Sequence, residues 1–325
     1  MKVIIRADAS VDIGSGHVMR CLTIADKLRE RGHEVVFFML PLTGNLIGLA
    51  ESRGFRVIGQ MEPAHLCIID HYGIDRKWER EIRSLVKKIV VIDDLANREH
   101  DCDVILDQNM VPDYERRYDA LVPEHCVKLL GPQYLILRDE FIRVRNGMRP
   151  RSGKVRKLLI FMGGSDPTGE TLKVLKALEE HGQPFERVDV VVGAANPARA
   201  LVRDICERRG YAYHCQIDYM AQLMAEADFS IGAGGSTTWE RCYVGLPSSS
   251  TIVADNQLAA TQTADALGVT VNLGRHGEVT ADTYRDLLRA LPEQPHRWRR
   301  MSEQGMRLTE NTHGPHAWLK PIEEA

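Results

Sequence analysis

The sequence lacks a surplus of positive charge and lacks any long apolar run. Its 325 residues include 42 Lys and Arg against 45 Asp and Glu, a formal net charge of −3. A protein that follows nucleic-acid phosphates needs a basic surplus, so we expect no nucleic-acid partner. The first residues carry Lys2, Arg6 and Asp8 without an apolar core of signal-peptide length, and no segment approaches the length of a membrane span. We therefore expect a cytoplasmic protein without stable membrane anchoring.

Paired cysteines are also missing. The seven cysteines are scattered, odd in number and never spaced as Cys-x-x-Cys, which favours reduced thiols over a disulfide or zinc framework. No group of His, Asp and Glu has metal-ligand spacing, so we expect neither a metal nor another cofactor. Asp101-Cys102-Asp103 matches the metal–diphosphate signature of one glycosyltransferase class, but it precedes an apolar strand. We interpret it as a turn at the edge of the sheet away from ligands.

Short runs rich in Val and Ile alternate with helical stretches, a pattern typical of an α/β fold with doubly wound parallel sheets. In the first half of the chain the predicted strands are 2–5, 34–40, 65–69, 88–92 and 103–106. In the second half they are 158–162, 187–192, 212–216, 228–232, 249–253 and 270–272. The two halves therefore predict two Rossmann-like domains, and the cleft between two such domains is a common ligand site.

A basic stretch with little apolar content separates the halves. Residues 143–157 (RVRNGMRPRSGKVRK) contain two glycines and a proline and are typical of an exposed linker. The predicted organisation is an N-terminal domain at 1–145, a linker at 146–156, a second domain at 157–300 and a helical tail at 301–325.

The beginning of the chain carries the first candidate site. An apolar strand runs into a loop with Gly14 and Gly16, and His17 stands in the first turn of the predicted helix. The positive end of a helix dipole disfavours imidazolium, so the ring stays neutral and can accept a proton from water. The alternative is a histidine that only bonds a neighbouring loop. Asp8 and Asp12 either orient the ring or terminate the strand.

A second glycine-rich loop follows the predicted strand 228–232. In IGAGGSTTWE, small residues let a ligand approach the backbone, and Ser236 and Thr237 open a helix that offers N–H groups and hydroxyls to phosphate. Glu240, one turn inside, can accept hydrogen bonds from ribose hydroxyls. The alternative is a capping box from Thr237 to Glu240. The glycines exceed what capping needs, which favours a nucleotide site.

Two further loops follow strands of the second half. The amides of Asn256 and Gln257 suit hydroxyls and phosphate oxygens, although an Asp or Asn cap on the next helix explains this segment better on its own. Gly164 belongs to a glycine pair that leaves room for another anion-facing loop. Asp166 as N-cap and Pro167 at the first helical position explain most of that segment.

Two strands of the first half also end in polar side chains. Asp70 and Tyr72 follow one strand, and Asp93 and Asp94 follow the next. The carboxyl ends of parallel strands form the ligand-facing edge of such a sheet. Each of these side chains either contacts a sugar or belongs to a turn.

Together these motifs resemble a known family. RADASVDIGSGHVMRCLTIA, PLTGNLI, IDHYGI, IDD, CDVILDQN, LVP, GPQYLILRDEF and MGGSD, in this order, resemble the pseudaminic-acid pathway hydrolases of UDP-2,4-diacetamido-2,4,6-trideoxy-β-L-altropyranose. Related spore-coat polysaccharide proteins share these motifs. GAGGSTTWE, GLP and DNQ resemble the donor domain of two-domain (GT-B) UDP-sugar glycosyltransferases. The resemblance covers nearly the whole chain and thins after about Gly274.

The resemblance implies a GT-B-type arrangement in which the first domain binds the sugar and carries catalysis, while the second binds UDP. It implies that His17 is the catalytic base and that the main chain of Ile217 reads uracil. It further implies that Ser236 and Thr237 hold the diphosphate, and that Glu240 holds the ribose. The remaining substrate contacts that we predict are Gly14, Gly16, Asp70, Tyr72, Gly164, Asn256 and Gln257.

The chemistry that follows is a metal-independent hydrolysis. UDP is already a stabilised leaving group, so one base that activates water suffices, and in-line attack predicts inversion with cleavage of the C–O bond. The expected partners are the UDP-sugar substrate and the UDP product, bound by a monomer. The alternatives are a GT-B glycosyltransferase and a non-catalytic UDP-sugar sensor.

Overall fold

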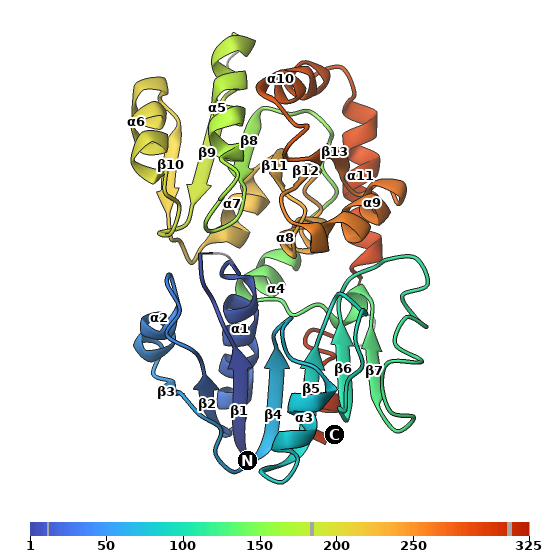
Figure 1. The fold of residues 1–325 in the computed structure, drawn as a ribbon. Helices are drawn as coiled ribbons and strands as arrows, with labels where there is room; N and C mark the ends of the chain where they lie inside the picture. Colours follow the sequence, from blue (N-terminus) through green and yellow to red (C-terminus); the bar gives the residue numbers. More distant parts are fainter. Residues whose placement is uncertain (12, 183–184, 311–313, 325) are drawn as a thin grey trace. The chain divides into compact units, whose positions relative to one another are not determined.

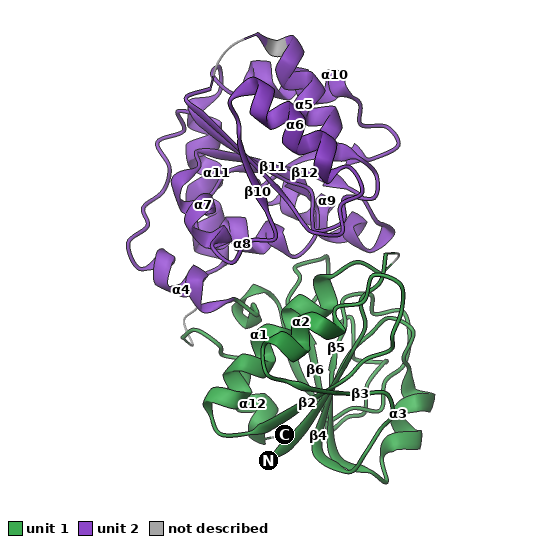
Figure 2. Cartoon of the chain, turned by 90° about the vertical axis from the view of Figure 1, so that its left-hand side faces the viewer, with its two compact units in different colours: residues 1–137, 311–325 green, residues 138–310 purple. Residues whose placement is uncertain are grey.

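The computed structural model describes residues 1–11, 13–182, 185–310 and 314–324. It divides the chain into two compact units, Met1–Leu137 with Asn311–Ala325, and Arg138–Glu310 (Figure 2). The predicted boundaries lie at 145 and 156, whereas the structure passes to the second unit at Arg138. The predicted tail is also divided, because its final segment belongs to the first unit.

The first unit is built on a parallel sheet of seven strands (Figure 1). Its strands are β1 (Lys2–Ala7), β2 (Glu34–Phe38), β3 (Arg56–Ile58), β4 (Ala64–Asp70), β5 (Val86–Ile92), β6 (Val104–Asp107) and β7 (Val127–Leu130). Their order is β3-β2-β1-β4-β5-β6-β7. The helices are α1 (Gly16–Glu30), α2 (Ile47–Ser52), α3 (Arg76–Ile82), α12 (Leu319–Glu324) and the 3₁₀ turn η1 (Pro132–Tyr134). The order reverses between β1 and β4, so a ligand crevice is expected at the carboxyl ends of these two strands.

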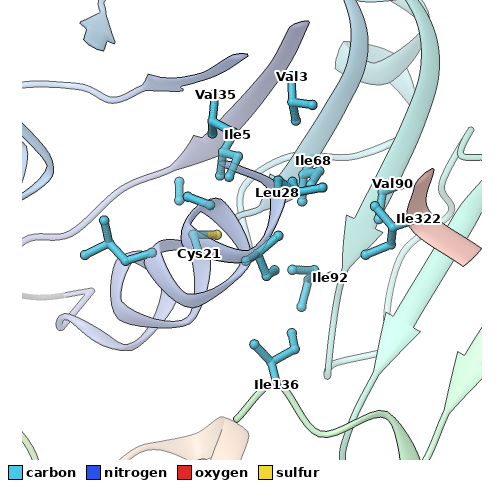
Figure 3. Packing of buried hydrophobic residues seen from close by; sticks show 14 of the residues in the cluster. Val3, Ile5, Cys21, Leu28, Val35, Ile68, Val90, Ile92, Ile136 and Ile322 are labelled. Atoms are coloured by element: carbon cyan, nitrogen blue, oxygen red, sulfur yellow. The ribbon is translucent and has the colours of Figure 1, made fainter. Parts of the chain in front are cut away.

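The strands of this unit are nearly continuous apolar runs because both faces of the sheet are covered. Val3 and Ile5 of β1 and Ile68 of β4 pack with Leu28 of α1 on one face, as Figure 3 shows. Cys67 and other residues of β4 contribute to a second cluster on the opposite face. Alternate residues therefore serve two cores, and α1 is fixed along the sheet with its first turn near the end of β1.

The second unit has a parallel sheet of six strands. These are β8 (Lys157–Phe161), β9 (Arg187–Val192), β10 (Ala212–Cys215), β11 (Phe229–Ala233), β12 (Ser248–Ile252) and β13 (Val271–Arg275), in the order β10-β9-β8-β11-β12-β13. Its helices are α4 (Asp139–Arg145), α5 (Glu170–His181), α6 (Arg199–Arg209), α7 (Met220–Glu226), α8 (Thr237–Tyr243), the 3₁₀ turn η2 (Asp255–Gln257), α9 (Leu258–Ala266), α10 (Ala281–Ala290) and α11 (Pro295–Leu308). Here the order reverses between β8 and β11.

The predicted fold class is confirmed, since every predicted strand overlaps an observed one. The sequence missed β3 and β7, which lie at the two edges of the first sheet. Both are short and only partly buried, so neither presents a long apolar run. No helix of the described chain is long and apolar enough to cross a membrane.

The basic stretch 143–157 is not the free linker that its composition indicates. The Arg145 guanidinium donates a hydrogen bond to the Tyr243 carbonyl, and Arg151 donates to three carbonyls at the C-terminal end of α7. A Cβ on Gly153 would stand 1.8 Å from the carbonyl oxygen of Pro295. Arg145 and Arg151, whose charge favours an exposed linker in the sequence, therefore attach this segment to the rest of the second unit.

Candidate functional site

His17 lies in the first turn of α1, at the carboxyl end of the first sheet. The loop before it turns at Gly14, whose φ of +79° is costly for other residues. Gly16 begins the helix, and a Cβ there would meet no described atom within 4 Å. His17 itself is only 8% exposed. The glycines thus leave space beside a nearly buried imidazole.

The partner of His17 is Asp70, the last residue of β4. Nδ1 of His17 lies 2.5 Å from Oδ1 of Asp70, and Arg20 donates to both carboxylate oxygens at 2.8 Å. The thiol of Cys21 lies 3.6 Å from Oδ2. Each oxygen of this carboxylate, which is 1% exposed, therefore has two contacts. The Asp70 carboxylate thus faces His17, Arg20 and Cys21, and its predicted contact with the substrate stays a prediction.

Asp70 determines the protonation pattern of the imidazole. Burial raises the pKa of Asp70, but the Arg20 guanidinium and His17 together lower it by more than burial raises it. The pKa of Asp70 is therefore below its ordinary value. The ionised carboxylate only accepts hydrogen bonds, so Nδ1 must carry the proton. Among the described residues, His17 makes no hydrogen bond through Nε2. In the neutral ring this nitrogen is therefore an available proton acceptor.

Tyr72 packs against the imidazole of His17. Its ring meets that of His17 edge to face, with centroids 4.5 Å apart and planes at 84°. Its hydroxyl bonds Asp94 beyond the end of β5. Burial raises the pKa of Asp94, although Arg20 and Tyr72 oppose that shift. Tyr72 and Asp94 thus belong to the surroundings of His17, as their place at the sheet edge indicated.

Asp8 does not orient His17. Its carboxylate accepts hydrogen bonds from Arg6 at 2.6 Å and from the Leu40 amide at 2.8 Å, and Nε2 of His71 lies 3.4 Å away. Burial raises the pKa of Asp8, but hydrogen bonds from His71 and Arg6 lower it to below its usual range. The Asp8–His71 pair is a second carboxylate–histidine pair at this edge. Asp12 lies outside the described residues.

Other acidic residues of the first unit have partners within that unit. The Asp93 carboxylate accepts hydrogen bonds from the backbone amides of Leu95 and Ala96, which is typical of a turn. It also accepts one from the Tyr118 hydroxyl at 2.9 Å. Burial raises the pKa of Asp107, at the end of β6, to about 7.

The Asp101-Cys102-Asp103 segment lies at the opposite edge of the sheet, where Arg83 donates hydrogen bonds to the carboxylates of both aspartates. In the described chain, no cluster of His, Cys, Asp and Glu is arranged to hold a metal ion.

In the second unit, the glycine-rich loop follows β11. A Cβ on Gly234 would stand 2.1 Å from Oγ1 of Thr261, so the backbone there requires glycine. The helix α8 begins at Thr237 with Ser236 as its cap, and Ser236 makes no side-chain cap bond. The predicted alternative, a capping box starting at Thr237, is therefore wrong. Glu240 is half-buried, and its Oε1 lies 3.3 Å from Nη2 of Arg138.

Gln257 lies beside this loop. Its Oε1 accepts a hydrogen bond from the Val253 amide at 3.0 Å, and its Nε2 would lie 3.7 Å from a Cβ on Gly235. Asn256 is exposed on the 3₁₀ turn that precedes α9. Gln257, not Asp or Asn, occupies the cap position of α9, and it makes no cap bond. The glycine-rich loop after β11 and the segment with Asn256 and Gln257 after β12 therefore lie at the ends of neighbouring strands.

The remaining predicted contacts of this unit lie along the same sheet edge. Gly164 follows β8, and its carbonyl oxygen is 2.2 Å from where a Cβ of Gly193 would stand. Ile217 follows β10 and is half-buried, two strands beyond β8. Asp166 is not the N-cap of α5, which starts at Glu170. Its carboxylate nevertheless accepts from the first two amides of that helix at 2.9 Å each.

Two arginines were missed by the sequence reasoning. Arg20 stands three residues after His17, a spacing that places both on one helix face and provides a usable signal. Arg241, one residue after Glu240, is buried in α8. No signal in the sequence separates it from the many surface arginines.

No family model matches this chain. It is 31% identical over 208 residues to the UDP-2,4-diacetamido-2,4,6-trideoxy-beta-L-altropyranose hydrolase of Campylobacter jejuni, covering 61% of this chain and 71% of that protein. It is 26% identical over 295 residues to the spore coat polysaccharide biosynthesis protein SpsG of Bacillus subtilis, covering 87% and 86%. An uncharacterised protein of Methanocaldococcus jannaschii is 29% identical over 266 residues, 76% of this chain, but the match spans only 54% of that protein.

Among solved structures, the spinosyn rhamnosyltransferase SpnG has a TM-score of 0.66 at 14% identity, covering 99% of this chain and 100% of its own. MurG of Acinetobacter baumannii has a TM-score of 0.64 at 13% identity, covering 100% and 99%. At such low identities these likenesses show the fold, which is that of GT-B glycosyltransferases. The sequence match over most of the Campylobacter jejuni protein goes further. The chain belongs to the family of the UDP-2,4-diacetamido-2,4,6-trideoxy-beta-L-altropyranose hydrolase.

Proposed function

We propose that the protein hydrolyses a UDP-linked 2,4-diacetamido-2,4,6-trideoxy hexose of the altrose type to the free sugar and UDP, as a step of pseudaminic-acid biosynthesis. The observation that carries the proposal is the pairing of His17 with Asp70, since it leaves Nε2 as a proton acceptor. The name of the Campylobacter jejuni relative supports the substrate class. The free cysteines fit a reducing compartment, and we place the reaction in the cytoplasm.

In this mechanism Nε2 of His17 takes a proton from a water molecule as its oxygen attacks the anomeric carbon. The bond between that carbon and the UDP oxygen breaks, and UDP leaves with the electron pair. Attack from the face opposite UDP inverts the anomeric centre. The imidazolium that forms is stabilised by the ionised Asp70, which Arg20 keeps deprotonated. UDP needs no protonation, so this mechanism uses one base and no metal.

We assign UDP binding to the second unit. The loop at Gly234 and Gly235 admits a diphosphate close to the backbone, where Ser236 and Thr237 present hydroxyls. Glu240 would accept hydrogen bonds from the ribose, in exchange for part of its contact with Arg138. The other predicted contacts of this unit are Gly164, Ile217, Asn256 and Gln257. Gly14 and Gly16 make room for the sugar beside His17.

A glycosyltransferase is the second candidate, because the structural neighbours are glycosyltransferases. A UDP-sugar sensor without turnover is the third. Incubation with the UDP-sugar and no acceptor separates them: a hydrolase releases UDP and reducing sugar in equal amounts, and absence of turnover contradicts our proposal. His17→Gln is expected to abolish turnover while UDP still binds. A His17→Gln variant with the full rate would show that the mechanism is wrong.

A further inference from the structure

The guanidinium of Arg241 is buried beneath the glycine-rich loop of the second unit. The residue is 1% exposed. Its Nη2 donates to the Ala233 carbonyl at 3.0 Å, to Oγ1 of Thr238 at 2.9 Å and to Oγ of Ser250 at 3.0 Å. These acceptors belong to β11, α8 and β12. One nitrogen thus joins the end of β11 to the two elements that follow it.

This buried cation forms no ion pair with any residue that the structure describes. Among the described residues, no carboxylate lies within ion-pair distance of Arg241, and Nε has no hydrogen-bond partner. The neighbouring Glu240 pairs with Arg138 instead. Burial lowers the pKa of Arg241 to about 10, so the guanidinium remains charged at neutral pH. Keeping an unpaired charge out of water is costly, and neutral acceptors compensate only part of that cost.

The position of the charge coincides with the point where the strand order reverses. A Cβ on Gly232 would stand 2.1 Å from Nη1 of Arg241 and 2.9 Å from the Phe161 carbonyl oxygen. Gly232 belongs to β11 and Phe161 ends β8, the two neighbouring strands between which the order reverses. In open parallel sheets, ligands bind outside the carboxyl ends of the strands at this point. The glycine at 232 provides the space that the guanidinium occupies.

We infer that Arg241 is an internal cation that stabilises the diphosphate of a nucleotide bound on the loop at 232–236. This inference rests on the proposed assignment of UDP to the second unit. Glu240 acts on Arg241 only through space, and the diphosphate would supply a further negative charge on the side of the glycine loop. Because three neutral acceptors hold the guanidinium in place, its field is directed before the ligand arrives and no rearrangement is needed on binding. The bond to the Ala233 carbonyl also fixes the end of β11.

A purely structural role would give a different result, and Arg151 provides the matched control. Arg151 is another arginine of this unit that donates to backbone carbonyls, and its pKa is also lowered to about 10 by burial. Its acceptors, which include the Ala227 carbonyl, precede β11 and so lie at the opposite end of that strand. Arg151→Gln therefore removes a comparable cation far from the loop.

The test is calorimetric titration of UDP, UMP and uridine into the full chain and its variants. We expect Arg241→Gln to weaken UDP binding about tenfold or more, UMP less, and uridine less than twofold, because only phosphate charge is affected. Arg241→Lys should retain most of the UDP affinity, and Arg151→Gln all of it. If Arg241→Gln does not fold, Arg241→Met replaces it.

Unchanged UDP affinity in Arg241→Gln, in a wild type that binds and hydrolyses, would overturn this inference and leave the proposed function standing. Equal losses of UDP and uridine affinity would also overturn it, because they indicate a structural role. A wild type that binds no UDP would overturn both the inference and the assignment of the nucleotide to this unit.

Discussion

Replacing Asp70 by Asn tests how much of the activity depends on the carboxylate behind His17. The side chain keeps its size but loses its charge and one acceptor atom. Arg20 donates to both carboxylate oxygens and His17 donates to one of them. The NH₂ group of Asn must therefore face a donor, whichever of the two oxygens it replaces. If it faces His17, the ring is forced into the tautomer that carries its proton on Nε2, which cannot accept one from water.

The expected effect on turnover is a loss of about 10²- to 10⁴-fold, the range found when the orienting carboxylate of a catalytic histidine is replaced. Removing one partner of a buried ion pair also costs about 3–5 kcal/mol of folding free energy. The assay is the initial rate of UDP release at saturating UDP-sugar, with thermal unfolding measured on the same sample. UDP affinity should not change, because UDP is assigned to the other unit.

The matched control is Glu79→Gln. Glu79 is fully buried in the same unit, and one of its oxygens lies 2.6 Å from Nδ1 of His100, away from His17. Breaking this pair should lower stability by a similar amount and leave kcat unchanged. If Asp70→Asn retains kcat within about threefold, or if Glu79→Gln loses activity equally, the assigned role of Asp70 is wrong.

Two further predictions concern stability. Burial raises the pKa of Asp107 to about 7 in the folded protein, against roughly 3.9 in an unfolded chain. Between these values the folded state holds more protons, so the contribution of Asp107 to stability falls as pH rises from about 4 to about 7. Asp107→Asn should flatten that part of the curve of Tm against pH, and a curve parallel to that of the wild type would contradict it. Gly153→Ala should lower the free energy of unfolding by about 1–3 kcal/mol in urea titrations, because Pro295 blocks the added methyl group at a φ of +88°. Gly147→Ala, whose Cβ meets open space, should change it by less than about 0.5 kcal/mol, and equal effects would contradict the packing of residues 143–157.

Most strands of both sheets were predictable because they contain short runs rich in apolar residues between turn-forming residues, whereas the short, partly buried edge strands β3 and β7 were missed. The position of His17 was predictable for the same reason, since the glycines mark where the strand stops and the helix starts. Its pairing with Asp70 was not. That contact depends on the parallel register that places Ala7 of β1 opposite Asp70 of β4, and one sequence does not specify register between strands.

Arginines account for most of the remaining errors. Arg145, Arg151 and Arg241 are all long charged side chains, which sequence reasoning assigns to the surface. In the fold they bond carbonyls and hydroxyls that are left without partners at the ends of helices and strands. Such acceptors arise only from tertiary packing, so composition described 143–157 as a linker and gave no indication of a cation under the glycine loop.

The central claim is that a water molecule activated by His17 attacks the anomeric carbon of the sugar. The most direct measurement is hydrolysis of the UDP-sugar in H₂¹⁸O without an acceptor, followed by mass spectrometry of both products under conditions in which the free sugar does not exchange. We expect one ¹⁸O atom in the released sugar and none in UDP. Label in the β-phosphate of UDP would show attack at phosphorus and contradict this mechanism.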